Sequence, residues 1–320
     1  GNLMHVSNLF ENPWQEEVAK LLIDRFWTKG RVFFCNSGTE ANEAGIKLIR
    51  KYFKDRGEKR YRIITFYNGF HGRTFGSMSA TAQEKIQKGF EPLLDGFDYA
   101  VFNDFDSVLK ALRDDTAGIM LEVIQGEGGI RVANYEFLQK VQELCSREGL
   151  LLFIDEVQTG IGRTGRFFAY EHFGLKPDIV SLAKGLGGGF PVGALVAREE
   201  VAKSFSAGSH GSTFGGNPLA CACAKVVINK VSGMLEHIRE VGDYFKKSLE
   251  GLKVGEAKGM GLMLGLDIQK DCSPVVKNAL EKGLIINCTA NTVLRFVPPL
   301  IIEKHHVDEA IKILSSVLLV

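Results

Sequence analysis

The sequence lacks an excess of either charge. It has 39 lysine and arginine residues against 38 aspartate and glutamate residues, for a formal net charge of +1. Proteins that bind nucleic acid through its phosphates usually carry a basic surplus. The balance therefore argues against a nucleic-acid-binding protein.

Long hydrophobic runs are also missing. The longest apolar stretches, such as 150–154, are far shorter than the roughly 20 residues that a membrane-spanning helix needs. The first residues, GNLMHVSN, do not show the basic, apolar and small-residue order of a signal peptide, and they read like the middle of a protein. We therefore expect a cytoplasmic protein without membrane association.

Cysteine is scarce and scattered. Five of the six cysteines lie among apolar neighbours; the six are Cys35, Cys145, Cys221, Cys223, Cys272 and Cys288. Such cysteines are more typical of buried thiols in a reducing compartment than of disulfides, so we predict free thiols. The pair at 221 and 223 has no second ligand pair nearby, and we expect no metal site.

What is present is an ordinary globular composition, with 45% hydrophobic residues over 320 positions. Short apolar runs alternate with helical patterns over the first two thirds, and the runs are 32–34, 62–66, 118–123, 150–154, 179–182 and 193–197. Runs of this kind are typical of buried parallel strands, so the pattern predicts an α/β domain with a mostly parallel sheet. Ligands of such domains lie beyond the carboxyl ends of the strands.

The texture changes after Asn217-Pro218. A long helical region reaches about Leu252 with an interruption near Gly233, and shorter strand-like and helical segments follow. Two or three antiparallel strands with helices on one side predict a small α+β domain. We therefore predict a large domain over 1–230 and a small one over 231–320.

One lysine stands out. Lys184 follows the apolar run 179–182 and precedes the glycine-rich segment 185–189. A lysine in a partly desolvated pocket can lose its proton and form a Schiff base with an aldehyde. Lys184 is therefore a candidate covalent attachment point; the alternative is a solvated lysine in a loop.

A second candidate site begins directly after the run 32–34, in the segment Asn36-Ser-Gly-Thr-Glu40. Ser37 and Glu40 have the spacing of a capping box, so a helix begins here. Its free N–H groups, with Gly38 allowing close approach and Thr39 adding a hydroxyl, are typical of a phosphate site. Capping alone would explain the serine and the glutamate.

Asp155 follows the apolar run 150–154 directly. A carboxylate at the tip of a buried strand needs a partner to stay ionised, and the protonated ring nitrogen of a cofactor would serve. A helix cap or an internal salt bridge is the alternative. The segment GIGRTG at 160–165 matches a dinucleotide fingerprint, but it lies five residues beyond the strand, so we do not expect a nicotinamide cofactor.

Three further loops carry polar groups after strand-like runs. The loop 68–74 places Phe70 three residues from Arg73, a combination suited to stacking on a ring and binding a carboxylate. The segment 121–129 brings acids to another strand end, and 211–218 is rich in hydroxyls and glycine before a helix. Each loop taken alone is equally well explained as an ordinary surface loop.

Together these segments resemble one family. The sequences SGTEANEA, GFHGRT, QGEGG, FIDEVQTGIGRTG, AKGLGGGFPVGA and HGSTFGGNPLA occur in the order found in class III pyridoxal-phosphate aminotransferases. The resemblance covers essentially the whole chain. It implies a fold-type I α/β transferase with pyridoxal 5′-phosphate as cofactor, and a homodimer with active sites at the subunit interface.

The resemblance also implies residue roles. The cofactor contacts would be Gly38, Thr39, Phe70, Asp155, Glu156, Val157, Gln158 and Lys184, with Thr213 from the neighbouring subunit. Lys184, which carries the cofactor and shuttles the proton, and Asp155, which pairs with the ring nitrogen, would be catalytic. Arg73 and Ser212 resemble contacts of the amino donor. Arg295 resembles a second carboxylate-binding arginine, and Glu127 the acid that covers it when the other substrate binds.

Within the family, the motifs are most similar to the branch that uses N2-acetylornithine and 2-oxoglutarate in arginine biosynthesis, giving N-acetylglutamate 5-semialdehyde and glutamate. Gly128 favours this branch, because ornithine δ-aminotransferases tend to carry alanine there. Ornithine, succinylornithine, acyl-lysine and 4-aminobutyrate remain open as donors. A non-catalytic interaction protein that kept the fold is a further alternative, against which the presence of both Lys184 and Asp155 argues.

Two features depart from the family pattern. Val123 stands where members usually carry proline, a packing change that we expect to be tolerated. Members also carry some tens of residues before the segment that begins with His5, and these form part of the small domain and one wall of the substrate pocket. The resemblance therefore implies that the N-terminal part of the small domain is missing from this chain.

Overall fold

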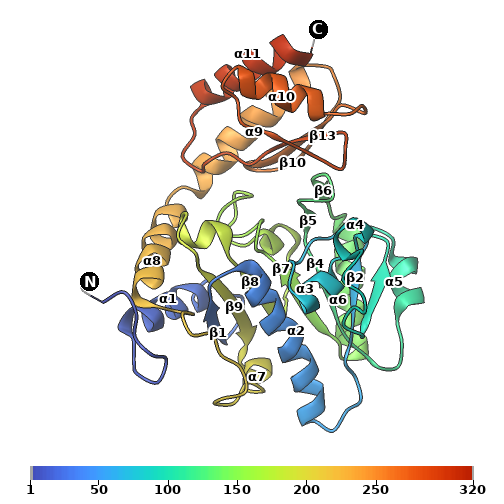
Figure 1. The fold of residues 1–320 in the computed structure, drawn as a ribbon, viewed down its shortest axis with the longest axis vertical. Coiled ribbons are helices and arrows are strands. Elements are labelled where there is room, and N and C mark those ends of the chain that lie inside the picture. The colour runs from blue at the N-terminus through green and yellow to red at the C-terminus, as the bar shows by residue number, and fades with distance from the viewer. Residues whose placement is uncertain (1–2, 319–320) are drawn as a thin grey trace.

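Two β-sheets organise the chain in the computed structural model, which describes residues 3–318. The larger sheet and its helices form the lower body in Figure 1, and the smaller sheet and its helices form the upper one. Helices α8 (Pro218–Ser232) and α9 (Leu235–Gly251) link the two bodies. The interruption near Gly233 is confirmed.

The larger sheet has seven strands in the order β1-β9-β8-β7-β4-β2-β3. Their bounds are β1 Gly30–Cys35, β2 Arg62–Phe66, β3 Phe97–Ala100, β4 Thr116–Leu121, β7 Leu151–Asp155, β8 Ile179–Leu182 and β9 Gly193–Arg198. The sheet is mostly parallel, as predicted. The run 193–197 is an exception: β9 pairs antiparallel with both neighbours, because the connection from β8 is too short for a crossover helix.

Helices cover both faces of this sheet. The remaining elements of the lower body are α1 Pro13–Ile23, α2 Gly38–Asp55, α3 Phe75–Ala80, α4 Glu84–Gln87, α5 Phe105–Ala111, α6 Tyr135–Glu148, α7 Glu199–Ala202, the 3₁₀ turns Ala169–Phe173 and Lys184–Gly187, and the short pair β5 Ile124–Gln125 and β6 Arg131–Val132. Successive strand residues face opposite ways, so Phe153 packs in the cluster of α2 while Ile154 packs in that of α1, α6 and α8.

The smaller sheet has four antiparallel strands, in the order β10-β11-β13-β12. They are β10 Glu256–Met260, β11 Met263–Asp267, β12 Asn287–Thr289 and β13 Val293–Phe296, and α10 Ser273–Glu281 and α11 Lys304–Leu318 pack with α9 against them. The predicted α+β character of this part is confirmed, with one strand more than expected. The proposed boundary after residue 230 lies close to the end of α8 and stays a prediction.

Cys272 and Cys288 form a disulfide, with their Cα atoms 5.6 Å apart. The prediction of free thiols is wrong for this pair. The two residues are 16 positions apart, and α10 turns the chain so that the start of the helix meets β12. Composition alone cannot show that the chain brings these two cysteines together. The other four cysteines are free thiols: Cys35, Cys145, Cys221 and Cys223.

Among the described residues, no single helix is both long and apolar enough to cross a membrane. Within residues 3–318, only α8 and α9 taken together reach that length and hydropathy, and this pair is bent by 68°.

Candidate active site

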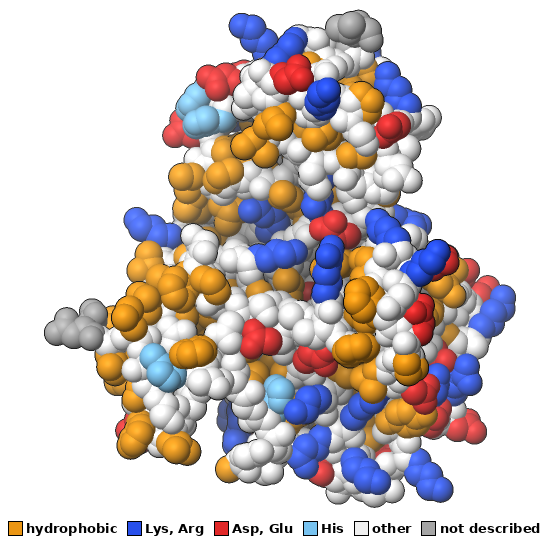
Figure 2. Space-filling view, viewed as in Figure 1, with side chains coloured by type: hydrophobic (Ala, Val, Ile, Leu, Met, Phe, Trp, Pro, Cys, Tyr) orange, Lys and Arg blue, Asp and Glu red, His pale blue; other side chains and the backbone are white. Residues whose placement is uncertain are grey.

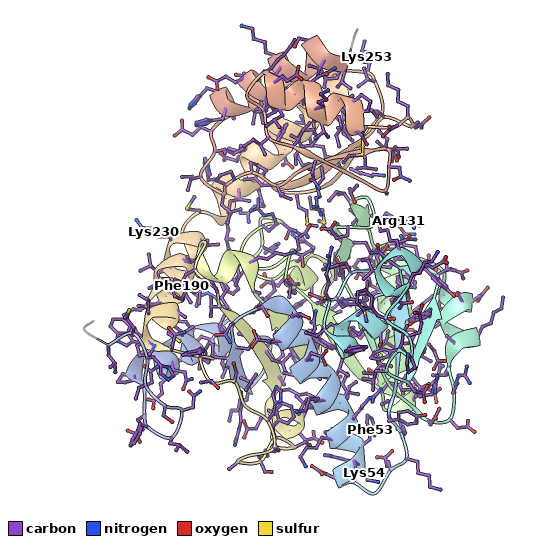
Figure 3. All side chains as sticks on the ribbon, in the orientation of Figure 1. Phe53, Lys54, Arg131, Phe190, Lys230 and Lys253 are labelled. Atoms are coloured by element: carbon purple, nitrogen blue, oxygen red, sulfur yellow. A yellow bond between two sulfur atoms is a disulfide. The ribbon has the colours of Figure 1, made fainter. Side chains whose placement is uncertain are left out.

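Helix α2 begins at the carboxyl end of β1 and has its N-terminus at the centre of the molecule. Phe53 and Lys54 mark its other end, away from the small sheet (Figure 3). The Ser37 hydroxyl accepts the N–H of Glu40 at 3.3 Å, which confirms the predicted cap. A methyl group at Gly38 would lie 2.6 Å from Cγ1 of Val157, so glycine keeps the first turn open. The free N–H groups of this turn suit an anion.

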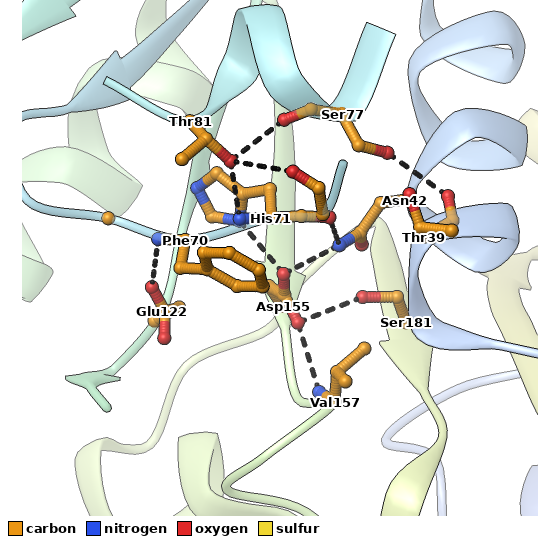
Figure 4. A network of polar contacts seen from close by, with 12 residues as sticks. Thr39, Asn42, Phe70, His71, Ser77, Thr81, Glu122, Asp155, Val157 and Ser181 are labelled. Carbon is orange, nitrogen blue, oxygen red and sulfur yellow. Dashed lines mark hydrogen bonds and ion pairs between the residues drawn. The ribbon is translucent and has the colours of Figure 1, made fainter. Parts of the chain in front are cut away.

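Asp155, the last residue of β7, is 3% exposed and firmly oriented. Its Oδ2 lies 2.7 Å from Asn42 Nδ2 and 2.8 Å from His71 Nδ1, and its Oδ1 accepts the N–H of Val157 at 3.0 Å (Figure 4). Burial by itself lowers the pKa of His71, but the hydrogen bond and charge of Asp155 outweigh burial, and the pKa is raised overall. The position of Asp155 therefore favours the protonated form of the His71 ring.

Glu122, directly after β4, is a second buried acid at the same place. Its carboxylate accepts the N–H of Phe70 at 2.8 Å and that of Gly126 at 3.2 Å. Burial raises the pKa of Glu122 to about 7. These two bonds tie the loop that carries Phe70 to the end of the strand.

A cavity of about 530 Å³ lies beyond the carboxyl ends of β7 and β8, within the size range of small-molecule sites. Its lining includes most of the residues predicted to hold a cofactor: Gly38, Thr39, Phe70, Asp155, Val157, Gln158 and Lys184. Arg73 and Glu122 line it as well. Lys184 follows β8 in a tight turn with φ of 42°, a left-handed conformation that is uncommon for a lysine.

A second cavity of about 320 Å³ adjoins the first, and Lys184 and Gln158 line both. Arg295, on β13 of the small sheet, lies here with its Nη1 2.7 Å from Oε1 of Glu127. Its Nε donates to Oδ1 of Asn287 at 3.1 Å. The structure thus brings together the arginine and the acid that were predicted as a pair, although they are far apart in sequence.

Glu156 lies on the other side of the strand end and lines neither cavity. Its carboxylate accepts the N–H groups of Ala169 and Tyr170, at 2.9 and 2.7 Å, and the hydroxyl of Thr159. Consecutive residues at a strand end point to opposite sides, so Asp155 and Glu156 cannot both face the cavity. The structure gives the Glu156 side chain a capping role, and its predicted cofactor contact stays a prediction.

The other predicted residues lie at the edge of the site. Arg73 is exposed at the rim of the first cavity. Ser212 accepts a hydrogen bond from Asn36 Nδ2 at 3.0 Å and lines neither cavity. Thr213 is exposed and also lines neither one, so its contact with a neighbouring subunit's cofactor stays a prediction.

Sequence reasoning assigned no role to Asn42, His71 or Asn287. Asn42 donates both to Asp155 and to the carbonyl of His71, and a signal for it was present, because it is a polar residue on the apolar face of α2. His71 belonged to a loop already suspected. Nothing in the sequence marks Asn287, since its partner Arg295 lies on the next strand.

A comparison with protein families matches residues 1–318 to the model described as aminotransferase class-III. The chain belongs to the class III aminotransferases. This class III aminotransferase is 62% identical to the acetylornithine aminotransferase of Aquifex aeolicus over 316 residues, which are 99% of this chain and 84% of the relative. It is 48% identical to the acetylornithine aminotransferase of Methanocaldococcus jannaschii over 98% of this chain and 81% of that one.

Solved structures resemble this class III aminotransferase over nearly its whole length. The ornithine aminotransferase from Toxoplasma gondii ME49 superposes with a TM-score of 0.93 at 31% identity, over 99% of this chain and 79% of that one. The N-acetylornithine aminotransferase from Stenotrophomonas maltophilia K279a gives 0.83 at 38% identity, over 100% and 83%. These neighbours confirm the predicted fold, and the protein is an aminotransferase enzyme.

Proposed function

We propose that this aminotransferase moves an amino group between N2-acetylornithine and 2-oxoglutarate, giving N-acetylglutamate 5-semialdehyde and glutamate. The observation that carries the proposal is the junction of the two cavities at Lys184, with the Arg295 and Glu127 pair beside it. The choice of the acetylated donor is supported by the relatives at 62% and 48% identity, both named acetylornithine aminotransferase.

The residues around the first cavity fit pyridoxal 5′-phosphate. Asp155 is a buried carboxylate at the cavity wall whose charge suits a protonated ring nitrogen, and the open first turn of α2 at Gly38 and Thr39 suits a phosphate. Phe70 and Val157 would cover the ring faces, Gln158 would lie near the phenolic oxygen, and Lys184 would meet the aldehyde. When bound, the cofactor supplies an electron sink for the bond that breaks at the amine-bearing carbon.

The chain's own residues supply the proton transfer and the electrostatics. Lys184 Nζ would be the base that takes a proton from the amine-bearing carbon of the substrate and passes it to the cofactor's former aldehyde carbon. Asp155 accepts hydrogen bonds from His71 and Asn42, and its carboxylate would favour a positive charge next to it in a site shielded from water.

Two substrates of unlike charge use one site in turn, which gives ping-pong kinetics. Glutamate carries two carboxylates, and its second carboxylate would take the place of Glu127 on Arg295. Acetylornithine carries one carboxylate, on the same carbon as its acylated nitrogen and away from the reacting amine, so Glu127 would stay on Arg295 while it reacts. Arg73 at the rim, together with Ser212, would bind the donor's single carboxylate.

We infer a homodimer in which Thr213 of one subunit reaches the cavity of the other. Large apolar side chains are exposed on one part of the surface, among them Leu9 at 91%, Phe10 at 68% and Phe214 at 56%. Figure 2 shows hydrophobic groups gathered at the lower left, over the N-terminal segment and α8. Patches of this kind mark interaction surfaces. We also propose a cytoplasmic location and a domain boundary after residue 230.

A panel of single half-reactions tests the function. The protein is loaded with pyridoxal phosphate, and the cofactor's visible absorbance is followed after adding acetylornithine, ornithine, succinylornithine or 4-aminobutyrate. We expect acetylornithine to exceed ornithine in kcat/KM by about tenfold or more, the selectivity that one well-fitted group provides. The Lys184→Ala variant should show no conversion with any donor.

Equal or faster conversion of free ornithine would sink the acetylated-donor assignment. Absence of any spectral change in the loaded wild type would sink the aminotransferase mechanism itself. Ornithine is the second candidate, because the Toxoplasma gondii ornithine aminotransferase superposes with a TM-score of 0.93.

A further inference from the structure

Arg163 is a partly buried arginine that lines the second cavity beside Glu127 and Arg295. It lies in the glycine-rich turn after β7, the segment whose resemblance to a dinucleotide fingerprint leads to no function. Among residues 3–318, no carboxylate lies within ion-pair distance of its guanidinium, and burial alone lowers its pKa to about 10. It therefore stays charged at neutral pH without a counter-ion. Partly buried charges without a partner are uncommon outside functional sites.

The backbone contacts of Arg163 reach the small sheet. Nη1 donates to the carbonyls of Leu262, at 3.0 Å, and Pro298, at 2.6 Å. The N–H of Leu262 donates back to the carbonyl of Arg163 at 3.0 Å. Leu262 immediately precedes β11, and Pro298 follows β13, its hydrogen-bonded neighbour. One guanidinium nitrogen thus joins the ends of two paired strands to the turn after β7.

This clamp acts on the strand that carries the second carboxylate-binding candidate. Arg295 lies on β13, three residues before Pro298. Its guanidinium already contacts Glu127, the carbonyl of Gly126 and Asn287. A shift of β13 would therefore move Arg295 relative to both cavities. The small sheet and the turn after β7 are separate elements. The hydrogen bonds of Arg163 therefore set the distance between β13 and that turn.

The other donors of Arg163 are free. Its Nε and Nη2 have no protein acceptor within the described residues, and neither is sealed from solvent. The cavity lining contains three basic side chains, Arg163, Lys184 and Arg295, against the single acid Glu127. Figure 2 shows lysine and arginine side chains along the waist between the two bodies. When Glu127 is bonded to Arg295, Arg163 is the arginine whose charge is not offset.

We propose that Arg163 is a positioning residue that makes the second cavity selective for the dicarboxylic substrate, glutamate or 2-oxoglutarate. It holds β13, and with it Arg295, at the cavity, and it supplies the positive potential that draws a second carboxylate toward Arg295 while Glu127 still covers it. The inference rests on the proposed function, because it requires two substrates that differ in their number of carboxylates.

The test compares the two half-reactions in the full chain loaded with pyridoxal phosphate. We expect Arg163→Met to raise the KM for glutamate by about tenfold or more, the scale of a lost charge-assisted hydrogen bond, and to leave the KM for acetylornithine nearly unchanged. Arg163→Lys keeps the charge but lacks the planar guanidinium that donates to two carbonyls. Its KM for glutamate should therefore lie between those of Arg163→Met and wild type. The control is Arg239→Met, because Arg239 donates to Gly165 of the same turn but lines neither cavity.

A non-reacting dicarboxylate provides an independent measurement. Glutarate should inhibit the acetylornithine half-reaction of wild type, and Arg163→Met should weaken this inhibition by the same factor. The proposal would be overturned in favour of a purely structural role if Arg163→Met raised the KM for glutamate and for acetylornithine equally. It would also be overturned if the KM for glutamate and the inhibition constant of glutarate stayed unchanged. If Arg163→Met does not fold, the same comparison made on Arg163→Lys decides. If wild type does not convert glutamate but does bind glutarate, the proposed function is overturned instead. In that case the effect of Arg163→Met on glutarate binding still tests the role of Arg163.

Discussion

His71 Nδ1 lies 2.8 Å from Oδ2 of Asp155, and the two side chains are only 1% and 3% exposed. The histidine comes from the loop after β2 and the aspartate from the end of β7, so two parallel strands deliver the partners to one point. A buried carboxylate without donors would take up a proton. His71 therefore supplies one of the donors that satisfy the buried Asp155 carboxylate in the proposed cofactor site.

Replacing His71 should weaken the cofactor site. His71→Leu leaves Asp155 with an unmet hydrogen bond, and we expect the free energy of unfolding to fall by about 1–3 kcal/mol. Retention of pyridoxal phosphate, measured by equilibrium dialysis, should fall as well. The exposed His305 offers a matched control, since His305→Leu should change neither quantity; retention equal to wild type in His71→Leu would count against the role of the pair.

Glu156 should make stability depend on pH. Burial raises the pKa of Glu156 from 4.5 to about 7, so between these values the folded protein keeps a proton that the unfolded chain releases. The free energy of unfolding therefore falls as pH rises through this window, by about 3 kcal/mol. Glu156→Gln should remove that part of the decline in urea titrations at pH 5 and pH 8. The slope of the exposed-site control Glu199→Gln should match wild type; an unchanged slope in Glu156→Gln would refute the assignment.

Glu127 should control access to Arg295. Its carboxylate lies 2.7 Å from the guanidinium and is about one-third exposed. In Glu127→Gln the arginine loses its internal counter-charge, so a dicarboxylate binds without displacing an acid. We expect the KM for glutamate to fall by about threefold to tenfold. This is the contribution of an exposed to half-buried ion pair, which glutamate would no longer have to break. The acetylornithine half-reaction should slow in stopped-flow traces, and a higher KM for glutamate would contradict the gate.

The disulfide between Cys272 and Cys288 should stabilise the small sheet. For a loop of 16 residues the chain-entropy model gives about 3 kcal/mol. The double variant Cys272→Ala and Cys288→Ser should therefore unfold at lower denaturant, and a reductant should shift wild type but not the variant. Cys35→Ser, at a free thiol, should remain as sensitive to reductant as wild type. Insensitivity of wild type to reductant would show that the bond contributes nothing.

Gly38 should tolerate no side chain. A methyl group there would lie 2.6 Å from Val157 Cγ1, so Gly38→Ala must displace either the helix start or Val157. Binding of pyridoxal phosphate should weaken by about tenfold or more, the scale of a misplaced anion contact. Gly251→Ala, where a methyl meets nothing within 4 Å, is the control. Equal affinity in Gly38→Ala and wild type would contradict the assignment of the phosphate site.

Local signals were strong where one strand or helix decides the outcome. The apolar run 150–154 ends at Asp155 and indicates both the strand and the acid at its tip. The spacing of Ser37 and Glu40 predicts the start of α2, and the structure has the cap there. The same reasoning was wrong for the direction of β9, because the direction of a strand depends on neighbouring elements. The resemblance implied a cofactor contact for Glu156, whose side chain lines neither cavity.

By itself, the sequence determined the alternation of strands and helices, the start of α2 and the family, because these depend on periodicity and on motifs within a few residues. Only the tertiary structure decided that Asn42 and His71 converge on Asp155, that Cys272 bonds to Cys288, and that Arg163 joins the turn after β7 to the strand of Arg295. These contacts join residues distant in the chain. Which of them meet depends on how the sheets and helices pack, and no local pattern contains that information.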